Sequence, residues 1–297
     1  MHGPSDPYVV CVGAATLDTI LAVPRHPAAD DRVVASELVR AGGGPAATAA
    51  VALARLGVPV FFVGAVGDDD AGAAIRAGLE REGVDISELV VAPGARSAES
   101  AILVEAGRGS RTIAAFLGTL PALELGARAR ELCSGAAWTH VDHLGYGAAR
   151  GTDTRLSVDA GNPIPELDLR EASLYGPTED ALRAACPGLD VEAAARAALA
   201  AGAELVVVTR GADGSLAFRD DGEAVVAPAL AVEPVSTLGA GDVFHGALLA
   251  QLVREVPLAA ALTAANACAA LACRALDGRA AIPTAQELDA VLAGSRG

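Results

Sequence analysis

Short apolar runs alternate along the chain with longer alanine-rich stretches, and this alternation predicts an α/β fold. Strands are predicted at residues 8–12, 60–63, 101–105, 137–141, 156–158, 205–209 and 215–219. Helices are predicted at residues 45–56, 71–82, 178–185, 191–201, 240–255, 258–275 and 284–293. A continuous apolar strand such as 205–208 suits a sheet covered on both faces, so we expect a mostly parallel, doubly wound sheet.

Two stretches, 21–40 and 89–119, interrupt this alternation. They contain extended, alternating segments with turn residues such as Pro24 and Gly94, and they carry few helical signals. We therefore expect them to pair into a small separate sheet that projects from the main domain.

The chain of 297 residues is long enough for one large domain with a small appendage. Its formal net charge of −15 disfavours nucleic acids and anionic membranes as partners, because both would be repelled. The longest uncharged run, 256–273, contains Pro257 and Asn266 and is too short and polar for a membrane span.

The chain contains no lysine, and all 22 basic residues are arginine. A P-loop nucleotide site and a eukaryotic-type protein kinase both require a lysine, so both classes are excluded. If the protein binds ATP, then backbone amides, arginine and a metal ion must neutralise the phosphates.

Five scattered cysteines form no Cys-x-x-Cys pair, and most lie in apolar runs. We interpret them as small core residues in a reducing compartment. The polar start of the chain leads directly into a predicted strand and does not resemble a signal peptide. Together these features predict a cytoplasmic location.

A turn of very small residues, Gly239-Ala240-Gly241, leads directly into a predicted helix that begins near Asp242. Backbone amides in such a turn can approach an anion, and the helix N-terminus adds partial positive charge. Asp242 is placed to accept a proton from an attacking hydroxyl group. Taken alone, the motif would hold only a dipole-balancing carboxylate in roughly two cases of three.

A second motif, Gly42-Gly43-Gly44, precedes Pro45 at a predicted helix start. Glycines there allow the backbone to approach a sugar, although an ordinary loop-to-helix turn explains the motif equally well. It is followed by the acidic triplet 68–70, for which a helix cap is favoured over a metal site.

The two motifs, in this order and spacing, resemble the PfkB/ribokinase family along nearly the whole chain. The resemblance implies one ribokinase-like kinase domain at 1–297, with a three-layer α/β/α core and a small β lid. The lid would comprise 14–41 and 89–119, and the nucleotide-binding core 42–88 and 120–297. It also implies that Asp242 is the general base and that Gly239, Ala240 and Gly241 form an anion hole.

The resemblance implies further site residues. Asp18, which would otherwise be read as a turn residue, corresponds to the aspartate that binds sugar hydroxyls, as carboxylates do well. Sugar-binding positions are also implied at Gly42, Gly43, Gly44 and Thr48. Nucleotide-binding positions are implied at Thr178, Thr209, Gly211, Gly214 and Asn266. A magnesium position is implied at Glu179, with ATP and Mg²⁺ as the expected cofactors.

The chain departs from the family pattern at several of these positions. Thr48 replaces a frequent asparagine, and Ser236 replaces an aspartate that helps to bind a monovalent cation, so potassium activation is uncertain. In the magnesium-ordering Asn-x-x-Glu segment, Thr178 and Ala181 occupy the two named positions. Glu179 or Asp180 would have to substitute.

The residues of the two motifs are most similar to those of the sulfofructose kinase and ketohexokinase branches of the family. The segment 139–145 lacks the arginine that would bind a sulfonate, so we expect a neutral ketose or related furanose. Asp142, His143 and Asp159 are candidate specificity residues, and a structural role for His143 is equally well supported.

Other readings remain open. A nucleoside kinase or a sugar-phosphate kinase of the same fold is one, because Arg96, Arg108 and Arg111 fall in the second lid segment. A non-catalytic sugar-binding homologue is another, and a nicotinamide-dependent oxidoreductase ranks lowest, because no Gly-x-Gly-x-x-Gly follows the first strand. The exposed edges of a small lid sheet also predict a homodimer formed through the lid.

Overall fold

A computed structural model describes residues 6–294 of the chain, so the outermost residues of the predicted 1–297 domain lie outside it. The main sheet has eight strands in the order β14-β13-β12-β11-β10-β9-β1-β4. Its strands are β1 (Val9–Val12), β4 (Val60–Val63), β9 (Trp138–Val141), β10 (Leu156–Asp159), β11 (Ala172–Gly176), β12 (Val206–Thr209), β13 (Ser215–Phe218) and β14 (Val225–Ala227). The strands from β4 to β12 pair in parallel, and β13 and β14 add an antiparallel edge.

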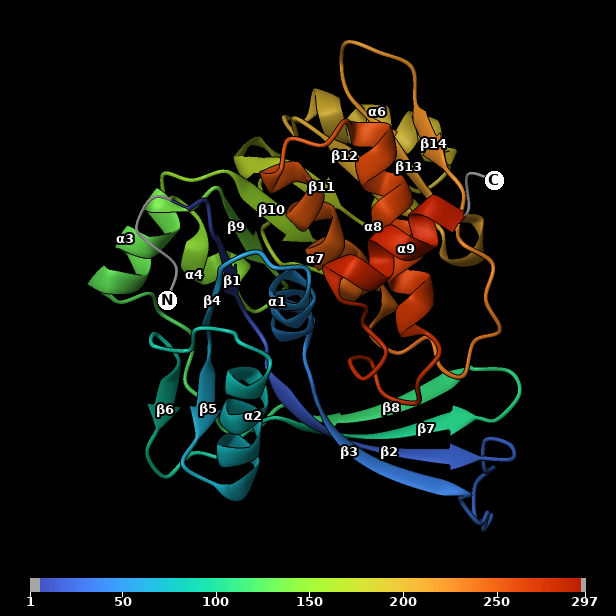
Figure 1. The fold of residues 1–297 in the computed structure, drawn as a ribbon. Coiled ribbons are helices and arrows are strands. Elements are labelled where there is room, and N and C mark those ends of the chain that lie inside the picture. Colours follow the sequence, from blue (N-terminus) through green and yellow to red (C-terminus); the bar gives the residue numbers. More distant parts are fainter. Residues whose placement is uncertain (1–5, 295–297) are drawn as a thin grey trace.

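Helices cover both faces of this sheet (Figure 1). One face packs against α1 (Pro45–Arg55), α7 (Ala240–Val253), α8 (Leu258–Ala272) and α9 (Ala285–Gly294). The other face packs against α3 (Ala127–Gly135), α4 (Tyr146–Ala149), α5 (Glu179–Ala185) and α6 (Val191–Ala200). The predicted three-layer α/β/α fold with a mostly parallel sheet is therefore confirmed.

A second, four-stranded sheet lies below the helical layer of α7 and α8 in Figure 1. Its order is β3-β2-β7-β8, from β2 (Thr16–Val23), β3 (Glu37–Gly43), β7 (Glu99–Glu105) and β8 (Arg111–Phe116). Ile20 and Ala22 of β2 and Ile102 and Val104 of β7 pack with Leu276, which follows α8. The lid sheet is thus anchored on the loop after α8.

The remaining elements extend the lid region. A two-stranded sheet of β5 (Ala65–Gly67) and β6 (Val90–Ala92) lies beside α2 (Asp70–Arg81), and short 3₁₀ turns occur at Leu169–Glu171 and Gly211–Asp213. Asp69 caps α2 by accepting a hydrogen bond from the Gly72 N–H at 2.8 Å, so this member of the acidic triplet serves as a helix cap.

Some elements differ from the predicted ranges. β3 runs to Gly43, beyond the predicted lid boundary at 41, and β6 falls within 89–119 but pairs with β5 outside the lid sheet. β11, in the middle of the main sheet, and α3 were not predicted. Within residues 6–294, no helix has the length and hydropathy that a membrane span requires.

Candidate active site

The start of α7 is open on one side. Gly239 adopts a φ of 71°, a left-handed conformation that favours glycine, and the first helical hydrogen bond runs from the Val243 N–H to the Gly239 carbonyl at 2.9 Å. The N–H groups of Gly241 and Asp242 have no acceptor among residues 6–294. Gly241 is exposed, and a Cβ atom added to it would meet nothing within 4 Å. Two free donors therefore lie at a positive helix end.

The Asp242 carboxyl is partly buried beside these donors. Burial raises its pKa well above the usual value, and the negative charges of Asp159 and Asp142 raise it further. The positive charges of Arg279 and Arg111 act in the opposite direction. A carboxylate with a raised pKa is a stronger proton acceptor once it is ionised.

The glycines at the end of β3 make room for other side chains. A Cβ atom at Gly43 would lie 2.0 Å from Asp18 Oδ2, and one at Gly42 would lie 2.4 Å from Arg279 Nη1. Gly44 adopts a φ of 90° where α1 begins against the Ala14 carbonyl. The three glycines thus bring Asp18 and Arg279 against the backbone of the same turn.

Asp18 is buried on the inner face of the lid sheet. Burial raises the pKa of its carboxyl, while hydrogen bonds from Thr16 and Ser100 and the charge of Arg279 oppose that rise. Thr48, in the first turns of α1, is also buried, and its hydroxyl accepts a hydrogen bond from Arg279 Nε at 3.2 Å.

Arg279 was not predicted as a site residue. It lies in the loop after α8, next to Gly278. A Cβ atom added to Gly278 would lie 3.0 Å from the Leu238 carbonyl oxygen. The loop therefore packs directly under the turn that opens α7. The sequence signal was weak, because an arginine after a predicted helix end is usually exposed.

Asp142 has a different role from the other acids of this region. Its Oδ2 accepts hydrogen bonds from the N–H groups of Ala14 (2.7 Å) and Ala46 (3.2 Å), and its Oδ1 accepts from Leu144 (2.9 Å) and Gly145 (3.0 Å). Burial raises its pKa, and the backbone hydrogen bonds oppose this rise. By these hydrogen bonds the carboxylate joins the loop after β1, the start of α1 and the loop after β9.

Asp159 lies at the carboxyl end of β10, and its Oδ1 is 3.5 Å from Nε2 of the buried His245 on α7. The His245 ring packs near His140, whose Nδ1 lies 3.1 Å from Ser157 Oγ. Burial, assisted by His245, lowers the pKa of His140 to about 3, so His140 is neutral at physiological pH.

His143 follows Asp142 and is partly buried. Its Nδ1 atom is one of three buried imidazole nitrogens without a hydrogen-bond partner in the described part of the chain. The others belong to His140 and His245. The contacts of His143 assign it neither to the sugar nor to the core.

All of the residues predicted for the nucleotide except Asn266 follow the carboxyl ends of β11 and β12. Thr178 caps α5 by accepting from the Ala181 N–H at 3.1 Å, and it forms a parallel bridge with Thr209. Gly211 and Gly214 follow, both with positive φ. Asn266 is buried in α8, and its amide donates to Ser215 Oγ and to the carbonyl groups of Ala227 and Pro228.

Glu179, the predicted magnesium position, is held by arginines. Its Oε1 accepts from Arg183 Nη2 at 2.7 Å, and its Oε2 accepts from Arg210 Nε at 3.0 Å. These hydrogen bonds lower its pKa. In residues 6–294 no cluster of three or more His, Cys, Asp or Glu side chains could hold a metal, so the chain does not fit a metal held by protein carboxylates alone.

Two further features surround the start of α7. Arg111 of β8 reaches from the lid and donates from Nη1 to Thr237 Oγ1 at 2.8 Å. The buried Ser236 hydroxyl accepts from the Leu238 N–H at 3.2 Å, so no carboxylate stands at the position linked to a monovalent cation. The lid and the turn before α7 are therefore in direct contact.

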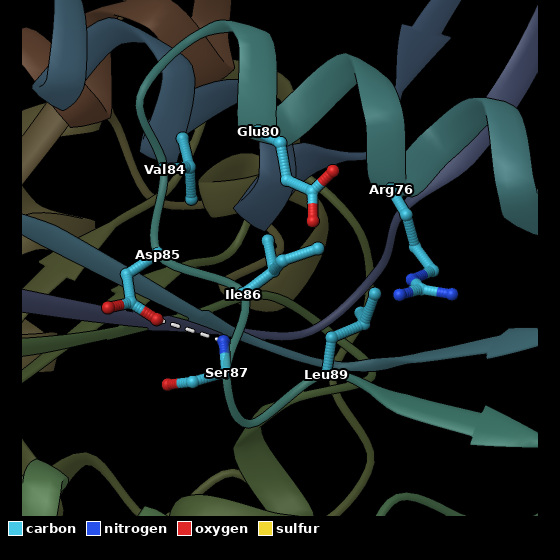
Figure 2. Close-up of a pocket in the computed structure, with 7 residues that line it drawn as sticks. All are labelled: Arg76, Glu80, Val84, Asp85, Ile86, Ser87 and Leu89. Carbon is cyan, nitrogen blue, oxygen red and sulfur yellow. Dashed lines mark hydrogen bonds between the residues drawn. The ribbon is translucent and has the colours of Figure 1, made fainter.

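A surface hollow lies apart from these residues. Figure 2 shows it between α2 and the segment that leads to β6. It is lined by Arg76, Glu80, Val84, Asp85, Ile86, Ser87 and Leu89. None of the predicted site residues lines it.

A model of the pfkB family of carbohydrate kinases matches residues 6–136 and 165–285. The chain belongs to the PfkB family. As a PfkB protein it is a kinase, a phosphotransferase with a hydroxyl group as acceptor.

Individual relatives of this PfkB chain span most of its length. It is 28% identical to the ribokinase of Bacillus subtilis over 294 residues, covering 95% of this chain and 99% of the relative. It is 31% identical to the ATP-dependent ribose-1-phosphate kinase of Halopiger xanaduensis over 310 residues, covering 96% and 97%. It is 33% identical to the aminoimidazole riboside kinase of Salmonella typhimurium over 282 residues, covering 84% and 87%.

Solved structures show the same fold as this PfkB chain. The ribokinase of Thermotoga maritima superposes with a TM-score of 0.84 at 24% identity, over 97% of this chain and 99% of that one. The ribokinase of Arabidopsis thaliana, complexed with ribose and ATP, superposes with a TM-score of 0.83 at 22% identity over the same shares. The ribokinase-like fold is thereby established.

Proposed function

We propose that this PfkB kinase transfers the γ-phosphate of ATP to a hydroxyl group of a small sugar, a ketose or related furanose. One observation carries the proposal: two backbone N–H groups, those of Gly241 and Asp242, have no acceptor in the described part of the chain and open α7 beside the Asp242 carboxyl. Free donors at a helix N-terminus stabilise anions, and a carboxylate next to them can deprotonate an alcohol.

In the proposed reaction Asp242 accepts the proton of the attacking hydroxyl group. The N–H groups of Gly241 and Asp242 donate to the transferred phosphoryl group, whose charge is spread over its equatorial oxygens. Asp18 and the turn at Gly42–Gly44 hold the other sugar hydroxyls. The lid sheet covers this region, which excludes water and limits hydrolysis of ATP.

ATP is supported as the donor by relatives. The Halopiger relative is named as ATP-dependent, and the Arabidopsis ribokinase structure contains ATP with ribose. The nucleotide would lie along Thr178, Thr209, Gly211, Gly214 and Asn266. Mg²⁺ typically takes its ligands from substrate phosphates and water, so we propose that it enters with ATP and does not occupy a protein-built site.

A sugar phosphate is the second candidate acceptor. The observation that favours it is the position of Arg111, which contacts Thr237 immediately before the α7 turn. The Halopiger relative is named as a ribose-1-phosphate kinase. A panel of ketoses, pentoses, nucleosides and their phosphates, followed by ADP release, separates these acceptors.

Replacing Asp242 with asparagine tests the mechanism. Asp242→Asn removes the proton acceptor but keeps the shape of the side chain, so turnover should fall by about 10²–10⁴-fold while ATP binding is retained. ADP release and equilibrium nucleotide binding measure the two effects. Asp70→Asn is the matched control, because Asp70 is an exposed acid in the first turn of α2. Unchanged turnover in Asp242→Asn would remove Asp242 from the mechanism.

A further inference from the structure

Arg279 is a buried cation near the proposed acceptor site that the mechanism above does not use. Only 6% of the residue is exposed. A buried guanidinium normally pairs with a carboxylate, yet no carboxylate of residues 6–294 forms an ion pair with Arg279. It is held by neutral partners instead, donating from Nε to Thr48 Oγ1 and from Nη2 to the Gly43 carbonyl at 2.7 Å.

The third nitrogen of the guanidinium is free. Nη1 lies over Gly42, at the place where a side chain would begin, and makes no hydrogen bond with the described residues. Burial lowers the pKa of Arg279 to about 10, and the negative charges of Asp18 and Asp242 oppose that shift. Arg279 is therefore charged at neutral pH and within electrostatic reach of both carboxylates.

Arg279 and Asp18 are chemically complementary toward a sugar. A guanidinium only donates hydrogen bonds, an ionised carboxylate only accepts them, and a sugar hydroxyl does both. A sugar can therefore donate to Asp18 and accept from Arg279. The positive charge of the arginine also offsets the negative charge of the Asp142, Asp159 and Asp242 carboxylates in this region.

We propose that Arg279 is a substrate-binding residue of the acceptor site, which donates from Nη1 to an oxygen of the sugar whose hydroxyl is phosphorylated. The inference rests on the proposed function, because it assumes that Asp18 and Asp242 flank the sugar. It also explains Gly42 and Gly43, which leave room for Arg279 and Asp18 against the backbone.

The first test is Arg279→Gln. A hydrogen bond from a charged donor contributes about 1.5–3 kcal/mol, so the KM for the sugar should rise by about 10–150-fold. The KM for ATP should stay within about twofold, because the nucleotide positions lie elsewhere. Steady-state kinetics with each substrate varied in turn measure the difference.

The pH profile gives a second readout. Asp242 faces Asp159 from β10, Asp142 from the loop after β9, Arg111 from β8 and Arg279, and His245 on its own helix pairs with Asp159. Removing the charge of Arg279 raises the pKa of Asp242. Because the base must be ionised, the acidic limb of kcat/KM should move to higher pH in Arg279→Gln.

Two further variants separate binding from folding. Gly42→Ala places a methyl group where Nη1 lies, and so displaces the guanidinium without removing it; it should raise the KM for the sugar as Arg279→Gln does. Arg279→Lys keeps the charge, so it should retain the acidic limb of the wild type while still weakening sugar binding.

Arg55→Gln is the matched control. Arg55 holds the same loop from outside through the Ala280 and Ile282 carbonyls, so its loss should lower thermal stability without changing the KM for the sugar.

Three results would overturn the proposal: an unchanged KM for the sugar in Arg279→Gln or Gly42→Ala, a rise confined to the KM for ATP, or the same change in Arg55→Gln. If Arg279→Gln does not fold, Gly42→Ala and Arg279→Lys decide the matter. A wild-type protein that phosphorylates no acceptor in the panel would instead contradict the proposed function itself.

Discussion

Asp142 and Asp242 show how surroundings give one residue type two roles. The Asp142 carboxylate accepts four backbone N–H groups and is fully buried, so its oxygens are committed to the fold. Asp242 forms no such set and lies beside two unpaired N–H groups at an exposed helix start. Hydrogen-bond saturation thus commits Asp142 to holding loops together, whereas Asp242 stays available for its proposed role as proton acceptor.

The raised pKa of Asp242 predicts a pH-dependent stability difference. Below the unfolded-state pKa of about 3.9 the carboxyl is neutral in both states. As pH rises from there through the raised folded-state pKa, the unfolded chain loses its proton first, so the wild-type protein loses stability over this range. The amide side chain of Asp242→Asn does not titrate. The Tm of Asp242→Asn minus that of the wild type should therefore increase from pH 4 to pH 8 in thermal-shift measurements at constant ionic strength. A difference that stays flat or shrinks would contradict this assignment of charge.

At the scale of elements, the end of β3 and the start of α1 bring the lid sheet to the core. β3 pairs with β2 through Gly43 opposite Thr16, and Gly44 begins α1 against the Ala14 carbonyl. Residues larger than glycine would not fit at this junction, because Asp18, Arg279 and the backbone of the loop after β1 occupy the space that their side chains would need. The junction therefore couples the shape of the proposed sugar site to the packing of two elements.

Gly43→Ala should damage this junction specifically. The added Cβ would lie 2.0 Å from Asp18 Oδ2 and 2.6 Å from Thr16 Oγ1, so Asp18 must move and kcat/KM for the sugar should fall at least tenfold. Gly78→Ala is the control, because Gly78 lies inside α2 with only one atom, Arg81 Nη2, at 4.0 Å from its added Cβ. It should gain about 0.5–1 kcal/mol of stability and keep its activity. Equal kinetics in the two variants would count against a tight Gly43–Asp18 contact.

Predicted and observed elements agree closely where the apolar pattern along the chain is clear. The ranges predicted for α1, α7 and β9 match the structure within two residues at each end. β11 was missed because only Leu174 and Tyr175 are large apolar residues in a run of five, and its place was decided by β10 and β12 on either side. A short central strand is specified by its neighbours more than by its own residues.

At the scale of the whole molecule, the outer face of the lid sheet carries a group of leucines. The register places Leu21 opposite Leu38 and Leu103 on one face, which points away from Ile20 and its packing on Leu276. Leu38 is 61% exposed, and within residues 6–294 the outer edges of β3 and β8 pair with no further strand. Exposed leucine and open strand edges favour association, so a second copy of this chain is the proposed partner.

Breaking this face should produce monomers. Light scattering coupled to size exclusion should give twice the mass of one chain for the wild type and a single-chain mass for Leu38→Glu with Leu103→Glu, because two buried charges would face each other across the interface. Val226→Glu changes an exposed position on β14, an edge strand of the main sheet outside the lid sheet, and should leave the mass unchanged. A wild-type protein of single-chain mass would contradict the dimer.

The sequence by itself determined the α/β class and the family, because these depend on periodicity and on motifs that are local along the chain. It also determined that phosphates must be neutralised without lysine. Only the tertiary structure decided that the Asp142 carboxylate accepts hydrogen bonds from backbone amides, that Glu179 is paired with two arginines and that Arg279 lies over Gly42. The Arg183–Glu179 pair lies within one helix, but the other contacts join residues that are far apart in sequence or whose positions depend on the shape of a loop. No local sequence pattern encodes which partners those residues meet.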